Sequence, residues 1–348
     1  MKILLVTLDY PPQFGGVGNY YQDLVETIGS GTVDVWQPLA GHWLSWFGKF
    51  WQKSRHYDLI WVGQLLPVGT VAWLCWLAGR SSYVISFHGL DIVLGNRNPW
   101  KRWLFRHIVA GAKAVSFNSK ATETLFKEYY PANKESVVVY PVPHTRPAHD
   151  LDKQKAKELL GLVGKKVLLT VGRLVRRKGQ RQVVELLPDV LKQVPNLQYI
   201  LVGQGKEEKG IRMITKDLGL ENTVQLLLKT NDQELSILYT AADVFILLNQ
   251  NDPNDPEGFG IVYLEAARFS LPSIAGVTGG VGEAVVSGET GLIVNPDDNQ
   301  AVMEAIVKLL TNEEYAKQLG NKGRERAEQM FSIETEAEKM KQLFIRSI

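Results

Sequence analysis

The sequence predicts an α/β fold of two doubly wound domains that face a central cleft. Short apolar runs alternate with amphipathic stretches along the 348-residue chain, which is typical of βα units around a mostly parallel sheet. The alternation stops over residues 141–150, PVPHTRPAHD, which hold three prolines and no apolar period. It then resumes with a second full set of runs. A chain of this length also exceeds the usual size of one hydrophobic core.

The expected strands are the apolar runs in each half of the chain. They are 3–7, 33–36, 58–62, 82–87, 114–117 and 137–140 in the first half, and 166–172, 197–203, 224–228, 243–248, 273–276 and 291–294 in the second. We therefore expect one domain over residues 1–147 and a second over 148–331. The last stretch, 332–348, has helical periodicity and is expected to cross back onto the first domain.

Composition excludes several classes of protein. The hydrophobic fraction is 45%, the charged fraction 22% and the net charge +2, so nothing indicates nucleic-acid binding. A single cysteine, Cys75, excludes an internal disulfide framework or a cysteine metal cluster and favours a reducing cytoplasm. The apolar run before Asp9 is too short for a signal peptide. Residues 61–79 approach the length of a membrane span, but Pro67 and Gly69 divide them, so we expect a strand, a helix and a strand.

Ligands of doubly wound sheets bind beyond the carboxyl ends of the strands. Glycine-rich turns follow the expected strands at these ends, at Gly15, Gly16, Gly172, Gly203, Gly205, Gly279 and Gly280. Because both domains open this way, a cleft between them is the expected binding site.

Residues 252–268, DPNDPEGFGIVYLEAAR, place Glu257 eight positions before Glu265. If the chain is helical from Phe259, the two carboxylates lie up to about 12 Å apart, farther than the roughly 5–9.5 Å of a glycosidase acid/base pair. They should then touch different parts of one long ligand, Glu257 a sugar and Glu265 ribose hydroxyls. The first backbone N–H groups of the helix would meet phosphate and sugar oxygens; they belong to Phe259, Gly260, Ile261 and Val262. Two solvated acids are the alternative.

Residues 171–179, VGRLVRRKG, present four cations just beyond an expected strand. A diphosphate leaving group gains negative charge as its glycosidic bond breaks, and fixed cations stabilise that charge. We expect Arg173 to bind two phosphate oxygens and Lys178 to act as a point charge. The alternative is a solvated basic turn.

Residues 9–20, DYPPQFGGVGNY, join a strand end to glycines that would open a helix. The segment has no P-loop lysine and no dinucleotide glycine spacing. Gly15 and Gly16 would admit phosphate or sugar close to backbone N–H groups; a simple helix-capping turn is the alternative.

His88 follows an expected strand at its carboxyl end, where it could hydrogen-bond a sugar hydroxyl or a developing charge. Asp91, three residues later, could orient the imidazole. The histidines form no spaced ligand set with the carboxylates, and proline follows both Asp252 and Asp255. We expect no metal ion at the site, because Arg173 and Lys178 supply the positive charge.

All nine tryptophans lie between Trp36 and Trp103. In residues 41–57 and again in 98–109, aromatic residues at helical spacing mix with Lys and Arg. Residues 1–150 hold 14 Lys or Arg against 10 Asp or Glu. Such helices suit an anionic membrane surface, or they simply cover the sheet, and both interpretations stay open.

These motifs resemble those of glycosyltransferase family four, whose fold of two Rossmann-like domains is called GT-B. The resemblance covers nearly the whole chain, and its most specific parts are GRLVRRKG, LVGQG, AADVFILL, PEGFGIVYLEAARFSLPSIAGVTGG and ETGLIV. Within the family the chain is most similar to bacterial phosphatidylinositol mannoside mannosyltransferases. Those enzymes use GDP-mannose and a lipid acceptor at the cytoplasmic membrane face.

By this resemblance, Arg173 and Lys178 match the family's diphosphate-binding pair, and Glu257 and Glu265 its paired glutamates. Gly16 matches its N-terminal glycine loop, and His88 matches the histidine near the transferred sugar. The resemblance also implies that anomeric configuration is retained, with same-face attack of the acceptor and a phosphate oxygen taking the acceptor proton.

Two departures from the family pattern concern the linker and the base. Residues 141–144, Pro-Val-Pro-His, replace an Asn-Gly-Val-Asp loop between the domains, and residues 229–231, Lys-Thr-Asn, replace a Gly-Arg-Val near the nucleotide base. The identity of the base is therefore less well determined than the type of reaction.

The sequence thus predicts a retaining, metal-independent hexosyltransferase with no further cofactor. The expected donor is GDP-mannose first and UDP-glucose second, and the acceptor a lipid-linked or glycan hydroxyl. We expect it in the cytoplasm, with peripheral association at the inner membrane left open. The alternatives are a glucosyltransferase or synthase for a soluble acceptor, a nucleotide-sugar-binding protein without turnover and, more weakly, a dehydrogenase.

Overall fold

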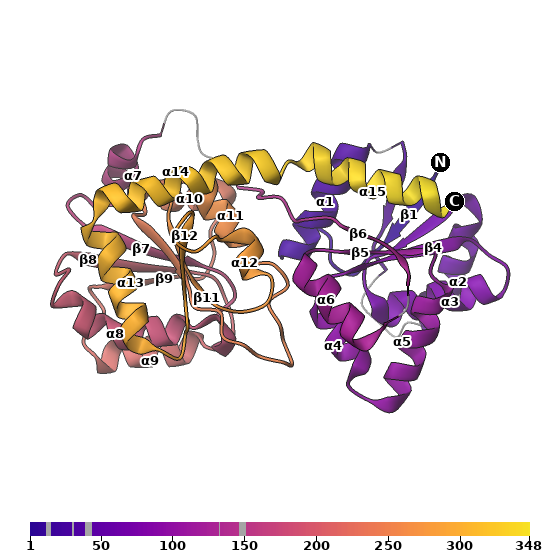
Figure 1. The fold of residues 1–348 in the computed structure, drawn as a ribbon, viewed down its shortest axis with the longest axis horizontal. Coiled ribbons are helices and arrows are strands. Elements are labelled where there is room, and N and C mark those ends of the chain that lie inside the picture. The colour runs from indigo at the N-terminus through magenta and orange to yellow at the C-terminus, as the bar shows by residue number, and fades with distance from the viewer. Residues whose placement is uncertain (12–14, 30, 39–43, 132, 146–150) are drawn as a thin grey trace. The chain divides into compact units, whose positions relative to one another are not determined.

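A computed structural model describes residues 1–11, 15–29, 31–38, 44–131, 133–145 and 151–348. The chain divides into two compact units, which are described separately (Figure 1). The first unit comprises residues 1–142, 253–259 and 331–348, and the second comprises 143–252 and 260–330. The expected boundary between residues 147 and 148 lies outside the described residues.

The first unit is built on a six-stranded sheet of order β2-β1-β3-β4-β5-β6. Its strands are β1 (Ile3–Val6), β2 (Val33–Trp36), β3 (Leu59–Val62), β4 (Ser82–Phe87), β5 (Ala114–Phe117) and β6 (Glu135–Val138). Each described pairing is parallel. The six expected strands are confirmed, although β6 lies two residues before the position expected from its apolar run.

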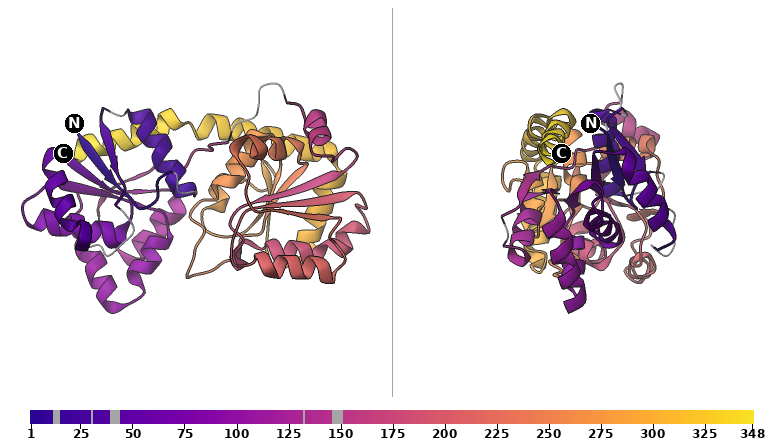
Figure 2. Two further views of the ribbon diagram at one scale, coloured as in Figure 1. Left: turned by 180° about the vertical axis from the view of Figure 1, so that it is seen from behind. Right: turned by 90° about the vertical axis from the view of Figure 1, so that its right-hand side faces the viewer.

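Helices cover both faces of this sheet, which explains why its strands are continuous apolar runs. The helices are α1 (Gly16–Ile28), α2 (Leu44–Lys53), α3 (Thr70–Leu77), α4 (Leu90–Asn96), α5 (Pro99–Gly111), α6 (Lys120–Tyr129) and α15 (Ile333–Ser347), with short turns η1 (Ser54–His56) and η2 (Leu65–Gly69). The residues of α1 and α15 pack on one face, and those of α2 to α6 on the other. Figures 1 and 2 show α15 and α5 on opposite sides of the sheet.

The stretch 61–79 forms the end of β3, then η2 and α3, before β4 begins at Ser82. The predicted strand, helix and strand are therefore confirmed. Within the ranges that the structure describes, no helix has both the length and the apolar character to cross a bilayer.

The second unit has a six-stranded parallel sheet of order β12-β11-β10-β7-β8-β9. Its strands are β7 (Lys166–Val171), β8 (Leu197–Val202), β9 (Val224–Leu227), β10 (Val244–Leu247), β11 (Ser273–Gly276) and β12 (Gly291–Val294). The helices are α7 (Lys153–Leu159), α8 (Gln180–Leu191), α9 (Glu208–Asp217), α10 (Asp232–Ala241), α11 (Ile261–Arg268), α12 (Val281–Ala284), α13 (Asn299–Thr311) and α14 (Glu313–Met330), with a turn η3 (Arg176–Lys178).

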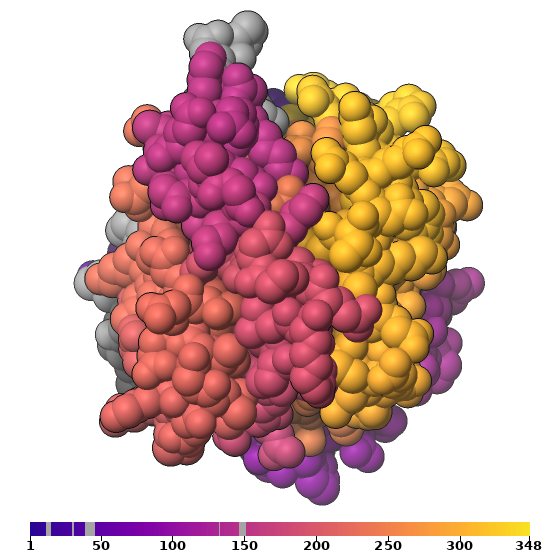
Figure 3. Space-filling model, turned by 90° about the vertical axis from the view of Figure 1, so that its left-hand side faces the viewer, coloured from indigo at the N-terminus to yellow at the C-terminus, as the bar shows by residue number. Residues whose placement is uncertain are grey.

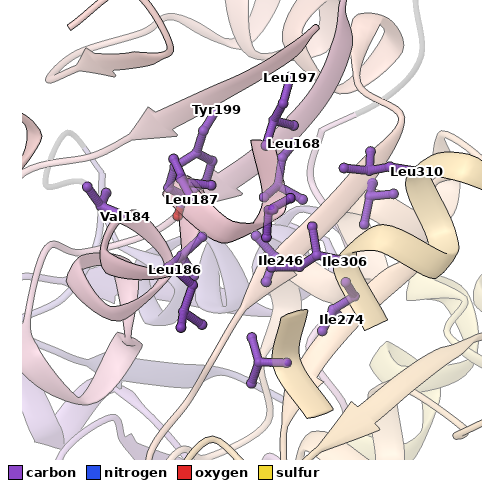
Figure 4. Close-up of a cluster of buried hydrophobic side chains, with 14 of the residues drawn as sticks. Leu168, Val184, Leu186, Leu187, Leu197, Tyr199, Ile246, Ile274, Ile306 and Leu310 are labelled. Carbon is purple, nitrogen blue, oxygen red and sulfur yellow. The ribbon is translucent and has the colours of Figure 1, made fainter. Parts of the chain in front are cut away.

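The core of the second unit lies between its sheet and the layer of α8, α9 and α13. Figure 4 shows Leu168 and Ile246 of the sheet facing Leu187 of α8 and Ile306 of α13. All four are fully buried, and each such side chain contributes about 1.5–3 kcal/mol on leaving water. Figure 3 shows α13 and α14, in orange to yellow, as a continuous band along one side of the unit. The packing of these helices on the sheet fixes the positions of the strands and of the loops at their ends.

Three aromatic side chains of the first unit contact one another, and each lies close in sequence to a point where the chain passes between the two units. Tyr140, Phe259 and Phe331 come just before or just after the passages at 142/143, 259/260 and 330/331. Their ring centroids lie 5.4–5.6 Å apart. Glu336, which is fully buried, accepts a 2.8 Å hydrogen bond from the Tyr140 backbone N–H. The C-terminal helix is thereby fixed to the first unit.

Candidate active site

The strand order of the second unit reverses beside β7. The strands β8 and β9 lie on one side of β7, and β10, β11 and β12 lie on the other. Loops that leave the carboxyl ends of the two central strands diverge at such a reversal and form a ligand crevice. Gly172 and Arg173 follow β7 at this point, and Asn249 and Gln250 follow β10.

The predicted cations lie on the loop after β7. Arg173 is exposed, whereas the Lys178 side chain in η3 is only 7% exposed. The turn is fixed to the end of β10, because the Gln250 backbone N–H donates a 2.6 Å hydrogen bond to the Arg177 carbonyl. Gly179 has φ +70°, and a Cβ there would lie 2.6 Å from the Leu248 carbonyl oxygen. The structure thus brings Lys178 to the strand reversal.

Gly172 and Gly203 differ in what surrounds them. Gly172 has φ +155°, and a Cβ there would meet no described atom within 4 Å, so space beside its Cα is open, while its N–H donates a 2.9 Å hydrogen bond to the Val202 carbonyl. Gly203 has φ +144°, and a Cβ there would lie 2.0 Å from the Gly172 carbonyl oxygen. Gly203 is therefore required where the loops after β7 and β8 approach each other closely.

Two buried amides at this place were not predicted from the sequence. Asn249 Oδ1 and Gln180 Oε1 are buried acceptors without a hydrogen-bond partner in the described part of the chain. Asn249 Nδ2 donates to the Tyr263 hydroxyl at 3.0 Å, which fixes the direction of the amide. Buried acceptors normally find a donor, so these two atoms mark the crevice as polar. The position of Asn249 directly after an apolar strand is the sequence feature that could have identified it.

The segment 252–268 does not form the single helix expected from Phe259. Gly260 adopts the left-handed conformation with φ +87°, so α11 begins only at Ile261. Phe259 is buried in the aromatic cluster of the first unit. Ile261 and Val262 lie in the first helical turn, whose N–H groups lack intrahelical acceptors, whereas Phe259 and Gly260 precede it. The prediction was wrong because glycine permits a sharp reversal at residue 260.

The two glutamates of this segment belong to different units. Glu257 lies in the first unit and Glu265 in the second, so the 12 Å estimate along one helix axis, about 1.5 Å per residue, does not apply to them. Glu265 is 8% exposed, and its Oε2 accepts a 3.0 Å hydrogen bond from the Tyr239 hydroxyl of α10. Burial raises the pKa of this carboxyl above its usual value. Tyr239 thus fixes the position of this carboxyl in the middle of α11.

The residue after Glu257 packs directly against the end of β4. A Cβ on Gly258 would lie 2.5 Å from the His88 carbonyl oxygen and 2.7 Å from Asn118 Nδ2. Ser119 Oγ donates a 2.6 Å hydrogen bond to the Gly258 carbonyl. The structure therefore brings Glu257 and His88 to one edge of the first sheet. Neither Asn118 nor Ser119 was predicted, although both follow an expected strand at its carboxyl end.

The imidazole of His88 is held by α1. Tyr21 donates its hydroxyl hydrogen to the Gly63 carbonyl at 2.7 Å, and the same oxygen lies 2.7 Å from His88 Nε2. Since a tyrosine has one hydroxyl hydrogen, Nε2 must carry the hydrogen of the second bond. The rings of Tyr20 and Tyr21 also meet the imidazole edge to face, both at 5.3 Å.

Burial lowers the pKa of His88 to about 4, so the ring is neutral at pH 7. A neutral imidazole with its hydrogen on Nε2 presents Nδ1 as an acceptor. His88 can therefore accept a hydrogen bond from a ligand hydroxyl, but it carries no positive charge. Tyr21 was missed because nothing in the sequence links α1 to the end of β4.

Asp91 does not orient the imidazole, contrary to the prediction. Its Oδ1 accepts a 3.1 Å hydrogen bond from the His88 backbone N–H at the start of α4. Burial raises the pKa of this carboxyl to about 6. The carboxylate thus satisfies free N–H groups at a helix start, which is its ordinary use. Tyr21 orients the ring instead.

The N-terminal glycine loop is described only in part, since residues 12–14 lie outside the described residues. Gly15 precedes α1, which begins at Gly16, and a Cβ on Gly15 would meet nothing within 4 Å. Gln64, which follows β3, joins the loop through its Nε2, which lies 2.8 Å from Asp9 Oδ2. Among the described residues, nothing therefore fills the space beside the Cα of Gly15. Gln64 is a further polar residue that sequence reasoning missed.

Within the described ranges, no three His, Cys, Asp or Glu side chains gather closely enough to hold a metal ion.

Comparison with known families adds the deciding observation. Residues 152–326, half of the chain, match the family described as glycosyl transferases group 1. Residues 3–143 match the family described as Glycosyltransferase Family 4. The chain belongs to these glycosyltransferases. The predicted family and the GT-B fold are confirmed, and this glycosyltransferase transfers a sugar from a nucleotide-sugar donor.

Relatives of the glycosyltransferase have several substrates. The GDP-mannose-dependent alpha-(1-6)-phosphatidylinositol monomannoside mannosyltransferase of Mycolicibacterium smegmatis is 28% identical over 92% of both chains. The N-acetyl-alpha-D-glucosaminyl L-malate synthase of Bacillus anthracis is 26% identical over 81% of this chain and 73% of its own. Anabaena Alr3699/HepE, solved with UDP and glucose, has the same fold, with a TM-score of 0.82 at 23% identity over 99% of both chains.

Proposed function

We propose that the glycosyltransferase moves mannose from GDP-mannose to a lipid-linked or glycan hydroxyl, with retention of configuration and without a metal ion. The observation that carries this proposal is the similarity to a GDP-mannose-dependent lipid mannosyltransferase over 92% of both chains. If GDP-mannose is not the donor, we expect UDP-glucose instead.

In this proposal Arg173 and Lys178 bind the donor diphosphate. Their loop leaves β7 at the strand reversal of the second unit, and no described atom fills the space beside the Cα of Gly172. Lys178 is nearly buried, and a fixed cation away from water stabilises a leaving diphosphate more strongly than a solvated one. These cations take the part that a metal ion has in other transferases.

The carboxylates and the histidine are assigned to the two sugars of the donor. Glu265, fixed by Tyr239, would bind the ribose hydroxyls, and the first N–H groups of α11 would bind phosphate oxygens. Glu257 would bind the transferred hexose. His88 Nδ1 would accept a hydrogen bond from one of its hydroxyls, because the ring is neutral and Nε2 is occupied by Tyr21.

The reaction breaks the bond between the anomeric carbon and the phosphate oxygen and forms one to the acceptor oxygen. The nucleoside diphosphate leaves with the electron pair of the broken bond, and one of its phosphate oxygens takes the acceptor proton. The acceptor attacks from the face that the diphosphate leaves, so configuration is retained. The protein supplies position and charge rather than a nucleophile.

A donor panel with two variants tests this proposal. GDP-mannose, UDP-glucose and related nucleotide sugars would be scored by thermal shift and by release of nucleoside diphosphate. We expect GDP-mannose to give the largest shift and the fastest release. Glu257→Ala and Lys178→Ala should each reduce turnover at least about 100-fold, the usual cost of losing one electrostatic contact to a transition state. Wild-type turnover in either variant, with unfolding temperatures unchanged, would refute the site.

A glucosyltransferase or synthase with a soluble acceptor is the second candidate. The departure at residues 229–231 from the family pattern near the base leaves the identity of the base, and with it a UDP-sugar donor, open. A relative that is a synthase adds to this. UDP-glucose as the best donor with a small sugar acceptor would favour it. Donor binding without diphosphate release from any donor would indicate a binding protein.

A further inference from the structure

Two neighbouring helices of the first unit expose large aromatic side chains. Trp100 and Trp103 on α5 are 61% and 56% exposed, and Trp76 and Leu77 at the end of α3 are 37% and 57% exposed. Apolar side chains of this size usually bury most of their surface. The exposure therefore needs an explanation beyond the fold.

These side chains form one continuous surface rather than scattered positions. The Trp73 ring of α3 lies 6.3 Å from that of Trp103 and 5.9 Å from that of His107 on α5. Trp100 precedes Trp103 by three residues, so both lie on the same side of α5. A Cβ on Gly111, at the end of α5, would lie 3.0 Å from the Trp76 ring. We call the set Trp73, Trp76, Leu77, Trp100 and Trp103 the aromatic strip.

The chain segment that carries the aromatic strip is rich in basic residues and poor in acidic ones. Between Asp58 and Glu123 the sequence holds one acid, Asp91, and seven Lys or Arg. Three of the arginines are exposed on or beside α5, namely Arg97, Arg102 and Arg106. Lys101 Nζ lies 5.6 Å from the Trp100 ring centroid. The strip is thus an apolar surface with positive edges.

The aromatic side chains of α2 that the structure describes, at positions 46, 47, 50 and 51, are not exposed in this way, although the sequence suggested both helices. Phe50 is fully buried and Trp46 is 5% exposed in the core of the first unit. Phe47 and Trp51 stack on each other at 6.2 Å. Trp46 and Phe50 of α2 thus pack on the sheet. Figure 1 shows α3 and α5 on the side of the sheet opposite α15.

We propose that the aromatic strip docks the first unit onto a bilayer that contains anionic lipids. Indole rings prefer the headgroup level, where their apolar body and polar N–H are both satisfied. Each Lys or Arg near an anionic surface adds about 1 kcal/mol of attraction. Lipid phosphates can pair with the three arginines. A protein partner would have to supply its own acidic side chains to neutralise them. Docking rests on these side chains alone and needs no particular donor or acceptor.

Vesicle flotation of the full chain tests the docking. One set of vesicles contains phosphatidylcholine only, and the other adds 30% phosphatidylglycerol. We expect the wild type to float with the anionic vesicles and to be released by high salt, because salt screens the arginines. Trp100→Ala with Trp103→Ala should weaken binding at least tenfold. Arg102→Glu with Arg106→Glu should weaken it at least 25-fold, from about 1 kcal/mol per lost charge.

Matched controls come from exposed residues of the second unit. Leu159→Ala with Met213→Ala removes two exposed apolar side chains, and Lys317→Glu with Lys322→Glu reverses two exposed charges. Both should float like the wild type. A wild type that stays with the soluble fraction, or strip variants that bind as well as it does, would overturn the proposal.

Donor turnover separates this outcome from failure of the proposed function. Release of nucleoside diphosphate from the donor alone should be unchanged in the strip variants, since these residues lie outside the proposed donor site. Flotation without any turnover would leave docking supported and the transfer refuted. Turnover without flotation would refute docking alone.

Discussion

Tyr21 determines which nitrogen of His88 is available to a ligand. Its hydroxyl hydrogen is used by the Gly63 carbonyl, so its oxygen can only accept from Nε2. The sequence pointed to His88 through its place after a strand. It could not reveal Tyr21, because the contact joins residues 67 positions apart. The sequence also suggested that Asp91 orients the imidazole, but its carboxyl instead accepts a hydrogen bond from the His88 backbone N–H just before α4.

Replacing Tyr21 by Phe should free the imidazole to exchange its tautomer. Nitrogen-15 NMR of the histidine rings should show His88 with hydrogen on Nε2 in the wild type and a mixture in Tyr21→Phe. We expect kcat/KM to fall roughly 10- to 100-fold, as for a small displacement of a substrate-binding group.

Tyr20→Phe is the matched control, because it keeps a ring at the edge of the imidazole. It should leave the tautomer unchanged. An unchanged tautomer in Tyr21→Phe as well would show that the hydroxyl does not set it.

The segment from Glu257 to α11 shows where prediction from sequence fails at the level of elements. Strands were predicted well, since buried parallel strands are short apolar runs between glycine-rich turns. The start of α11 was predicted two residues early, because the motif was treated as one helix. A left-handed glycine at 260 and the packing of Gly258 on β4 are tertiary features. They place Glu257 on the first unit and leave Glu265 on the second.

Gly258→Ala should displace the Glu257 segment from the first sheet. The added Cβ would lie 2.5 Å from the His88 carbonyl oxygen, against backbone that cannot move aside easily. We expect turnover to fall at least tenfold, with a loss of stability of about 1–3 kcal/mol from overpacking. Donor turnover and thermal unfolding would be measured together.

Gly48→Ala provides the control, since a Cβ at this helical position meets no described atom within 4 Å. It should have wild-type turnover and equal or slightly higher stability. Full activity in Gly258→Ala would mean that the segment can shift without consequence for Glu257.

For the molecule as a whole, two doubly wound units follow from the alternation of apolar runs, and the family match supports them. The sequence could not show how the chain passes between the units. Four passages exist, and three of them meet at Tyr140, Phe259 and Phe331. Nor could the sequence separate the two aromatic helices, because periodicity alone does not reveal that Trp46 and Phe50 of α2 are buried while Trp100 and Trp103 of α5 are exposed.

The most direct test of the account is the configuration of the sugar that the enzyme releases. With GDP-mannose and no acceptor, slow hydrolysis followed by proton NMR from the first minutes shows which mannose anomer forms before mutarotation. The proposed mechanism predicts α-mannose, the configuration of the donor, at a rate that Glu257→Ala and Lys178→Ala greatly reduce. Release of β-mannose first, or equal rates in the variants, would contradict it.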